Sequence, residues 1–232
     1  MNPEARVGLY YCPAEDDPLF AAGATWLGRD AFLGAPVRQP DLPGIEAVTA
    51  DPRLYGFHAT LKPPMRLVPG CSWRSLLAGV DGMAGGIAPF DLPPLAVTDL
   101  HGFLALRETV PSAQLQALAD VCVEKPDRFR APPSADELAR RRRASLTEAQ
   151  DTMLTRWGYP YVFGTWFFHM TLTRRLSAAE HAIWRPDAER FFAAAVAVPR
   201  RVTDVCLFTQ IGPGAPFVIA ERVALRGAVK PV

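Results

Sequence analysis

The chain has 232 residues, enough for one large domain or two small lobes with a sizeable hydrophobic core. Its formal net charge of +1 provides no overall field that would attract nucleic acid or an anionic membrane. The four cysteines are far apart and form no C-x-x-C pair, which argues against a zinc ribbon or a redox dithiol. We see no secretory signal and no apolar run long enough to cross a bilayer, so we expect a cytoplasmic protein with reduced thiols.

The first half of the chain predicts strands that alternate with helices. Apolar periodicity, interrupted by proline and glycine, predicts strands over 6–13, 54–62, 90–100 and 102–108, and helices over 14–32 and 72–85. Residues 33–44 are proline-rich and predict a loop. Pro63 and Pro64 are expected to end the strand before them, because proline cannot continue a central ladder.

The second half repeats the order of elements in the first. It predicts helices over 111–123, 135–158 and 177–197, the last broken or split by Pro186, and strands over 166–173, 201–210 and 217–225. We therefore expect an α+β fold of two pseudosymmetric lobes, each an antiparallel sheet with helices on its outer face, around a central cleft. The whole of 1–232 would be one domain, with lobes at roughly 1–110 and 111–232 that can exchange strands.

Two of the four histidines lie in matched settings, "YGFHATLK" at 55–62 and "WFFHMTLT" at 166–173. Side chains alternate between the faces of a strand, so each segment predicts one apolar face. The other face carries His58 with Thr60 in the first segment, and His169 with Thr171 in the second. Imidazole and hydroxyl groups are costly in an apolar strand unless they have partners, so we interpret both pairs as parts of a site between the lobes.

Paired imidazoles suit the cleavage of a phosphodiester. Histidine titrates near neutral pH, so one imidazole can act as base while the other, protonated, acts as acid. Threonine hydroxyls two residues further along can donate hydrogen bonds to phosphate oxygens. A single H-x-T triplet carries almost no specificity, and a lone histidine in a strand is more often structural. Two triplets at the same place in two similar halves favour catalysis by His58 and His169.

The segments "HATL" at 58–61 and "HMTL" at 169–172 resemble the paired motifs of the two-histidine (2H) phosphoesterases. This superfamily includes RNA cyclic phosphodiesterases and 2′-5′ RNA ligase-like proteins. Further segments, "YGFHATLKPP", "FRAPPS…ELARRR" and "RWGYPYV", resemble the branch associated with bacterial phosphonate utilisation. The resemblance extends from about residue 6 to residue 226, and an arginine-rich helix between the lobes departs from the shortest members.

The resemblance implies two lobes around a cleft, no metal and no cofactor. It implies His58 and His169 as the acid–base pair, and Thr60 and Thr171 as ligands of phosphate oxygens. The implied substrate is a small phosphorylated compound, a ribose cyclic phosphate such as 5-phosphoribosyl 1,2-cyclic phosphate. The implied reaction opens the ring to a phosphomonoester. RNA ends are an alternative partner, and a membrane is not expected.

Three further residues are candidates for substrate binding. Lys62 shares the histidine face of its strand by parity, although a solvated strand end explains it equally well. Tyr10 ends the first strand, where it points to the cleft or packs in the core. Arg130 lies in a proline-rich loop that can act as a lid. The run 140–143 consists of four arginines on a helix, and we interpret it as a solvated surface with salt bridges, because four consecutive residues face every side.

Three alternatives remain open from the sequence. A metal enzyme would need an acidic ligand beside the histidines, but neither motif strand has one on its histidine face, and no H-x-H or H-x-x-x-H spacing occurs. A non-catalytic RNA-binding protein would need a basic surface, which the net charge of +1 does not favour. RNA or nucleotide 2′,3′-cyclic phosphodiesterase or 2′-5′ RNA ligase-like activity would differ from our expectation only in substrate.

Overall fold

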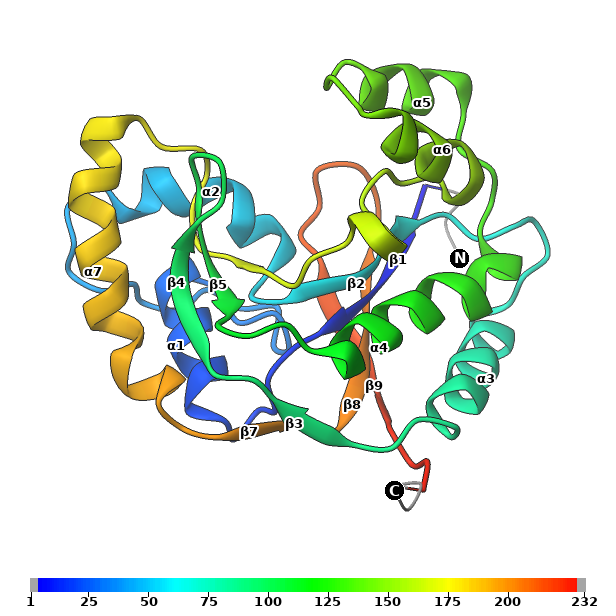
Figure 1. The fold of residues 1–232 in the computed structure, drawn as a ribbon, viewed down its shortest axis with the longest axis horizontal. Helices are drawn as coiled ribbons and strands as arrows, with labels where there is room; N and C mark the ends of the chain where they lie inside the picture. Colours follow the sequence, from blue (N-terminus) through cyan, green and yellow to red (C-terminus); the bar gives the residue numbers. More distant parts are fainter. Residues whose placement is uncertain (1–3, 229–232) are drawn as a thin grey trace.

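The computed structural model describes residues 4–228, which form an α+β fold around one large antiparallel sheet (Figure 1). The strands are β1 (Arg6–Tyr11), β2 (Ala59–Met65), β3 (Phe90–Leu92), β4 (Leu95–Asp99), β5 (Leu104–Glu108), β6 (Met170–Thr171), β7 (Arg200–Val202), β8 (Asp204–Gln210) and β9 (Val218–Ala224). Seven of them form the sheet in the order β4-β5-β6-β2-β1-β8-β9, and β3 pairs separately with β7. The predicted fold class, α+β, is confirmed.

Helices cover the sheet and extend beyond it. They are α1 (Pro18–Leu27), α2 (Ile45–Tyr55), α3 (Trp73–Ala84), α4 (Ala113–Glu124), α5 (Ala135–Arg142), α6 (Glu148–Trp157) and α7 (Ala178–Val196), with short 3-10 turns η1 (Lys125–Phe129) and η2 (Phe163–Thr165). Figure 1 shows α1, α2 and α7 grouped together, α3 and α4 on another part of the sheet, and α5 with α6 projecting at one end. None of the described helices is long and apolar enough to span a bilayer.

Both halves of the chain contribute strands to the same sheet. At its centre β2, from the first half, pairs with β6, from the second, and β8 and β9 continue the sheet beyond β1. The sequence predicts a sheet in each lobe, whereas the structure joins these strands into one continuous ladder. The division into two pseudosymmetric lobes stays a prediction.

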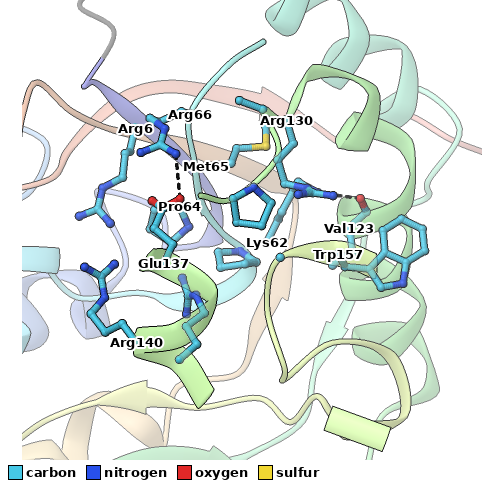
Figure 2. A pocket seen from close by; sticks show the side chains of 15 residues that line it. Arg6, Lys62, Pro64, Met65, Arg66, Val123, Arg130, Glu137, Arg140 and Trp157 are labelled. Atoms are coloured by element: carbon cyan, nitrogen blue, oxygen red, sulfur yellow. Dashed lines mark hydrogen bonds and ion pairs between the residues drawn. The ribbon is translucent and has the colours of Figure 1, made fainter. Parts of the chain in front are cut away.

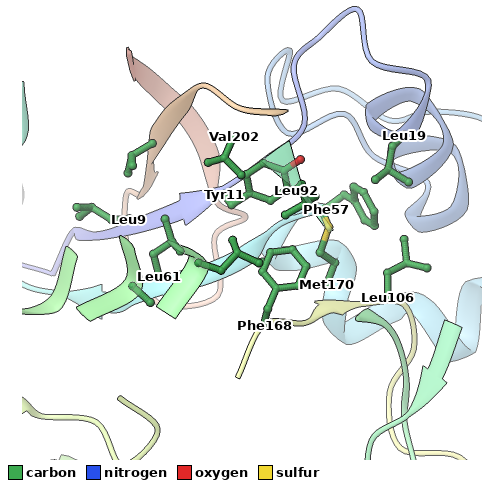
Figure 3. Close-up of a cluster of buried hydrophobic side chains, with 14 of the residues drawn as sticks. Leu9, Tyr11, Leu19, Phe57, Leu61, Leu92, Leu106, Phe168, Met170 and Val202 are labelled. Atoms are coloured by element: carbon green, nitrogen blue, oxygen red, sulfur yellow. The ribbon is translucent and has the colours of Figure 1, made fainter. Parts of the chain in front are cut away.

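The apolar faces of the two motif segments are buried in the main core, as their alternation predicts. Ala59 and Leu61 from β2, and Phe168, Met170 and Leu172 from the segment around β6, have no exposed surface. Figure 3 shows Leu61, Phe168 and Met170 within this cluster of apolar side chains. Complete burial of one face fixes the register, because a slip of one residue would move every core side chain to the opposite face.

Aromatic packing ties α1 and α7 to the centre of the sheet. The ring of Trp26 lies edge-on to Trp184 at 6.3 Å between centroids and 5.6 Å from Phe192. Its indole Nε1 donates a hydrogen bond of 3.0 Å to the carbonyl of Leu172, directly after β6. Trp26 is thus fully buried with its polar atom satisfied, and it fixes the backbone that carries the second motif.

Three of the differences between the predicted and the observed elements concern helices. Residues 45–55 form α2, although the sequence analysis assigns no helix there, and Pro52 lies inside it. The helix predicted over 135–158 is two helices, because Thr147 and Gln150 form a capping box that begins α6. The helix α7 runs without a break through Pro186, which occupies an exposed position where water can satisfy the freed carbonyl.

The strand β2 also continues through Pro63 and Pro64, contrary to the expectation that these prolines end it. Its only pair with β6 is Ala59 with Met170, so the edge of β2 beyond that point has no ladder on that side. Pro63 and Pro64 therefore leave no donor missing from a pair with β6.

Candidate functional site

The two motifs lie side by side on the central strands. Ala59 of β2 is the partner of Met170 of β6 in an antiparallel pair. One residue to either side, this register sets His58 beside Thr171 and Thr60 beside His169, on the face opposite the core. Each histidine therefore neighbours the threonine of the other motif. The structure thus brings the two motifs that carry the resemblance to the two-histidine phosphoesterases together on neighbouring strands.

The imidazole of His58 is held by one hydrogen bond at each ring nitrogen. Its Nδ1 lies 2.8 Å from the carbonyl oxygen of Gly56, and its Nε2 lies 3.2 Å from Oγ1 of Thr60. A carbonyl only accepts, so Nδ1 carries the proton and Nε2 offers a lone pair. Burial lowers the pKa of His58 to about 4, against the opposing effect of the Gly56 carbonyl, and the charge of His169 lowers it further.

The imidazole of His169 is oriented in the same manner. Its Nδ1 lies 3.1 Å from the carbonyl oxygen of Phe167, again two residues earlier in the chain, so Nε2 is the nitrogen left for chemistry. Burial lowers the pKa of His169, the hydrogen bond to Phe167 opposes this, and the positive charge of Arg107 lowers it further. In the protein without ligand, both imidazoles therefore favour the neutral form near pH 7.

Arg107 is a site residue that the sequence analysis missed. On β5, Leu106 is the partner of Met170, so the next position sets Arg107 beside His169 on the same face. Its guanidinium lies over the ring of Phe167 at 5.4 Å from the centroid and 3.7 Å from Glu108. Its Nε is buried without a hydrogen-bond partner among the described residues. A fixed cation beside an imidazole suits an anionic ligand.

A cavity of about 330 Å³ opens over the polar face of the central strands, and we call it the histidine cavity. The strands supply His58, Thr60, Thr171 and Thr173 to its wall, whereas His169 lies beside the cavity and does not line it. The remaining lining residues are Arg6, Tyr10, Asp51, Pro52, Tyr55, Gly56, Pro63, Pro64, Arg141 and Tyr159. Its volume suits a small, drug-sized ligand.

Tyr10 lines the histidine cavity, as a substrate-binding role requires. Its ring stacks on His58 with 3.9 Å between centroids and an interplanar angle of 26°. Its hydroxyl is buried with no hydrogen-bond partner among the described residues. Burial raises the pKa of Tyr10 well above its ordinary value, so the hydroxyl stays a donor.

Lys62 is not in the histidine cavity, and the parity argument fails for a specific reason. The partner of Tyr10 is Thr60, whereas the partner of the preceding Leu9 is Lys62, so β2 has one extra residue at this point. Such a bulge reverses the alternation and turns Lys62 toward α4. There its Nζ donates to the carbonyl of Val123 at 2.8 Å (Figure 2). The same Nζ pairs with Asp127 at 3.1 Å.

Arg130 is likewise absent from the histidine cavity. Its guanidinium forms two hydrogen bonds to the carboxylate of Asp127, at 2.7 and 3.1 Å, and a third to the carbonyl of Arg156. Lys62, Asp127 and Arg130 thus form one structural ion cluster that joins β2 to η1. A loop position alone does not reveal such a neighbour, which the fold supplies.

A second, smaller cavity adjoins the first, and we call it the arginine cavity (Figure 2). The two share Arg6, Pro63, Pro64 and Arg141. Arg6 could have been found from the sequence, because it has the same parity on β1 as Tyr10. Arg141 could not, since the run of four arginines contains nothing that distinguishes its members. Among residues 4–228 there is no group of three or more histidine, cysteine, aspartate or glutamate side chains that could hold a metal ion.

Comparison with known proteins adds a family and two curated relatives. Residues 60–218 match the family described as "Protein of unknown function (DUF1045)". A protein of Janthinobacterium sp. (strain Marseille) named "Ribose 1,5-bisphosphate phosphokinase PhnN" is 41% identical over 231 residues, covering 96% of this chain and 51% of that protein. A protein of Laribacter hongkongensis (strain HLHK9) with the same name is 34% identical, covering 95% of this chain and 52% of that protein. The chain spans about half the length of these relatives.

Solved structures with a similar course of the chain include E. coli LigT. The LigT complex with 3′-AMP has a TM-score of 0.48 at 15% identity, covering 95% of this chain and 97% of that chain. The apo form of LigT has a TM-score of 0.49 at 15% identity, covering 97% of this chain and 98% of that chain.

Proposed function

Because this chain belongs to the DUF1045 family and carries two H-x-T motifs on neighbouring strands, we propose that it is a metal-independent two-histidine phosphodiesterase. Its substrate is a ribose cyclic phosphate such as 5-phosphoribosyl 1,2-cyclic phosphate, and the reaction is hydrolytic opening of the ring. The observation that carries the proposal is the cross-strand arrangement of His58, Thr60, His169 and Thr171, the first, second and fourth of which line a cavity of about 330 Å³.

The proposed mechanism divides the work between the two imidazoles. His58 is the base, because it is neutral and its Nε2 carries a lone pair. In the protein without ligand this lone pair accepts the hydrogen bond of Thr60, and it can accept a proton from water once the Thr60 hydroxyl turns to the bound phosphate. The water oxygen attacks phosphorus, and one ring P–O bond breaks. His169, protonated at Nε2, donates its proton to the departing ring oxygen. The negative charge of the bound substrate raises the pKa of His169 and so supplies the protonated form.

The groups around the imidazoles hold the phosphate in this scheme. Thr60 and Thr171 donate hydrogen bonds to the non-bridging oxygens, whose charge grows as the bond to water forms. Arg107 supplies a fixed positive charge on the same face as His169. The Tyr10 hydroxyl, buried and without a partner among the described residues, donates to a substrate oxygen. These are the roles that an in-line displacement at phosphorus needs.

The name of the curated relatives supports the choice of sugar and of the bond that breaks. Both are named for phosphorylation of ribose 1,5-bisphosphate. Opening a 1,2-cyclic phosphate of ribose 5-phosphate between phosphorus and O2 leaves the phosphate on O1, and the product is ribose 1,5-bisphosphate. Opening at O1 would leave ribose 2,5-bisphosphate instead. We therefore propose that the bond to O2 breaks and that O2 receives the proton of His169.

A second candidate substrate is a nucleoside 2′,3′-cyclic phosphate, free or at an RNA end. It is favoured by two aromatic residues of the histidine cavity, Tyr55 and Tyr159, on which a base can stack. The chemistry would be unchanged, and only the group beside the cyclic phosphate would differ.

Phosphorus NMR tests the proposal and separates the candidates. The purified protein is incubated in excess chelator with 5-phosphoribosyl 1,2-cyclic phosphate, and separately with a nucleoside 2′,3′-cyclic phosphate. We expect only the cyclic phosphate of the sugar substrate to open, giving the resonances of ribose 1,5-bisphosphate. If only the cyclic phosphate of the nucleotide opens, the result would indicate a function on RNA ends instead. If neither ring opens, or if opening stops in chelator, the proposed reaction is wrong.

A further inference from the structure

We propose that Arg6, Arg140 and Arg141 form a second anion subsite that binds a phosphomonoester group of the substrate, away from the cyclic phosphate. This inference rests on the proposed function, because it takes the histidines to hold the first phosphate. Arg6 and Arg141 lie on the boundary between the histidine cavity and the arginine cavity. Arg140 lines the arginine cavity, and Figure 2 shows it on the same side of that cavity as Arg6.

The strand β1 sets the distance between the two subsites. Arg6, Gly8 and Tyr10 share the cavity face by strand parity, and Arg6 is four residues, about 13 Å along the strand, from Tyr10, which stacks on His58. The ring of Tyr10 lies over Gly8, which a larger residue would prevent, since a Cβ at this position would lie 2.6 Å from the ring. A long arginine side chain bridges part of this distance, which leaves room for a sugar rather than a chain of nucleotides.

The fold separates the roles of neighbouring arginines on α5. Arg142 forms hydrogen bonds to Asp151 at 2.7 Å and to Thr155 at 3.1 Å, which fixes α5 to α6. Glu137, at the start of α5, pairs with Arg66 at 2.8 Å and fixes the helix to the segment after β2. The helix is therefore held on both sides, and Arg140 and Arg141 are the members of the run that face the cavities.

The positive charges of this subsite are not neutralised by an ion pair. Among residues 4–228, neither Arg6, Arg140 nor Arg141 is within 4.0 Å of a carboxylate oxygen. The Arg141 guanidinium lies over the ring of Tyr159 at 4.8 Å, which orients it without neutralising it. Burial lowers the pKa of Arg141, and the charges of Arg140 and Arg6 lower it as well, whereas Tyr159 and the carboxylate of Glu137 act in the opposite direction. A bound phosphate would relieve this repulsion and supply acceptors for the guanidinium donors.

The test compares two cyclic substrates that differ in one phosphate. Steady-state kcat/KM is measured for 5-phosphoribosyl 1,2-cyclic phosphate and for ribose 1,2-cyclic phosphate, with the wild type, Arg141→Gln and Arg143→Gln. Arg143 is the matched control, because it has the same charge and is exposed at the end of α5. We expect Arg141→Gln to lower kcat/KM about tenfold to a hundredfold for the phosphorylated sugar and to leave the other substrate unchanged. Arg143→Gln should change neither.

Calorimetric titration with ribose 5-phosphate tests the subsite without any turnover. We expect the wild type and Arg143→Gln to bind this sugar, and Arg141→Gln to bind it about tenfold or more weakly. Equal losses on both cyclic substrates, or equal binding of ribose 5-phosphate by all three proteins, would overturn the subsite. If neither ring opens but the titration follows the expected order, the subsite stands and the proposed hydrolysis fails.

Discussion

The imidazole of His58 lies flat against the ring of Tyr10, with 3.9 Å between the ring centroids. Tyr10 is fully buried, and it also packs against Phe208 at 4.9 Å. The histidine is thus held between its two hydrogen bonds and an aromatic surface that belongs to the core. This contact links the stability of the sheet to the orientation of the proposed base.

Tyr10→Phe should separate stability from activity. The substitution keeps the stacked ring and removes a buried hydroxyl that has no partner among the described residues, so the free energy of unfolding should stay the same or rise by up to about 1 kcal/mol. If the hydroxyl donates to the substrate, kcat/KM should fall about tenfold to a hundredfold. Urea unfolding and steady-state kinetics measure the two effects. An unchanged kcat/KM would show that the Tyr10 hydroxyl does not contribute to substrate binding and that Tyr10 serves only in packing.

The pH dependence follows from the lowered pKa values of both histidines. His58 stays neutral above a pH of about 4, so its function as base is lost only in more acidic solution. His169 loses its proton as the pH rises through a value below its ordinary 6.5. The plot of kcat/KM against pH should therefore be bell-shaped with its maximum below pH 6.5. The anionic substrate raises both pKa values, so the maximum of kcat should lie at higher pH. A maximum of kcat/KM above pH 7 would contradict this assignment.

Asp127 holds two cations and should matter to stability. Burial alone would raise its pKa, but hydrogen bonds and charges from Arg130 and Lys62 outweigh burial and lower it. Asp127→Asn leaves the buried Lys62 without its counterion, so we expect the free energy of unfolding to fall by about 3 kcal/mol. Asp151→Asn is the control, because its pair with the exposed Arg142 should contribute less than about 1 kcal/mol. If urea unfolding shows that both variants lose the same free energy of unfolding, the buried cluster contributes no more to stability than the exposed pair.

Lys62→Met tests whether the bulge in β2 has removed Lys62 from the site. The side chain lines the arginine cavity, but its Nζ is bound to Val123 and Asp127 and does not enter the histidine cavity. We therefore expect kcat/KM to stay within about twofold of the wild type at a temperature where the variant is folded. Circular dichroism checks the fold. A tenfold loss in a fully folded variant would return Lys62 to the substrate-binding residues.

The central strands could be predicted from the sequence because burial imposes a period of two. Phe168, Met170 and Leu172 alternate with His169 and Thr171, and no other register buries the apolar side chains. The same rule fails at Lys62, since a bulge changes the parity and leaves no mark in the local sequence. Parity thus places Thr60 correctly and Lys62, two residues later, incorrectly.

The remaining parts of the site depend on contacts between distant segments. Arg107 becomes a neighbour of His169 only because β5 pairs with β6, a pairing that local sequence does not specify. Arg141 reaches the histidine cavity because two ion pairs hold α5 in place, one between Arg66 and Glu137 and the other between Arg142 and Asp151. The division of 135–158 into two helices was visible in the capping pattern of Thr147 and Gln150, which the helical periodicity obscured.

The measurement that tests the central claim most directly is the rate of ring opening by His58→Ala and His169→Ala. Phosphorus NMR in excess chelator follows 5-phosphoribosyl 1,2-cyclic phosphate, and circular dichroism confirms that each variant is folded. Each substitution should lower kcat about 10²-fold to 10⁴-fold, because each removes one proton transfer. His181→Ala, on α7 and outside the cavity, should keep the wild-type rate. Near-full activity in either folded variant of the paired histidines would contradict acid–base catalysis by this pair.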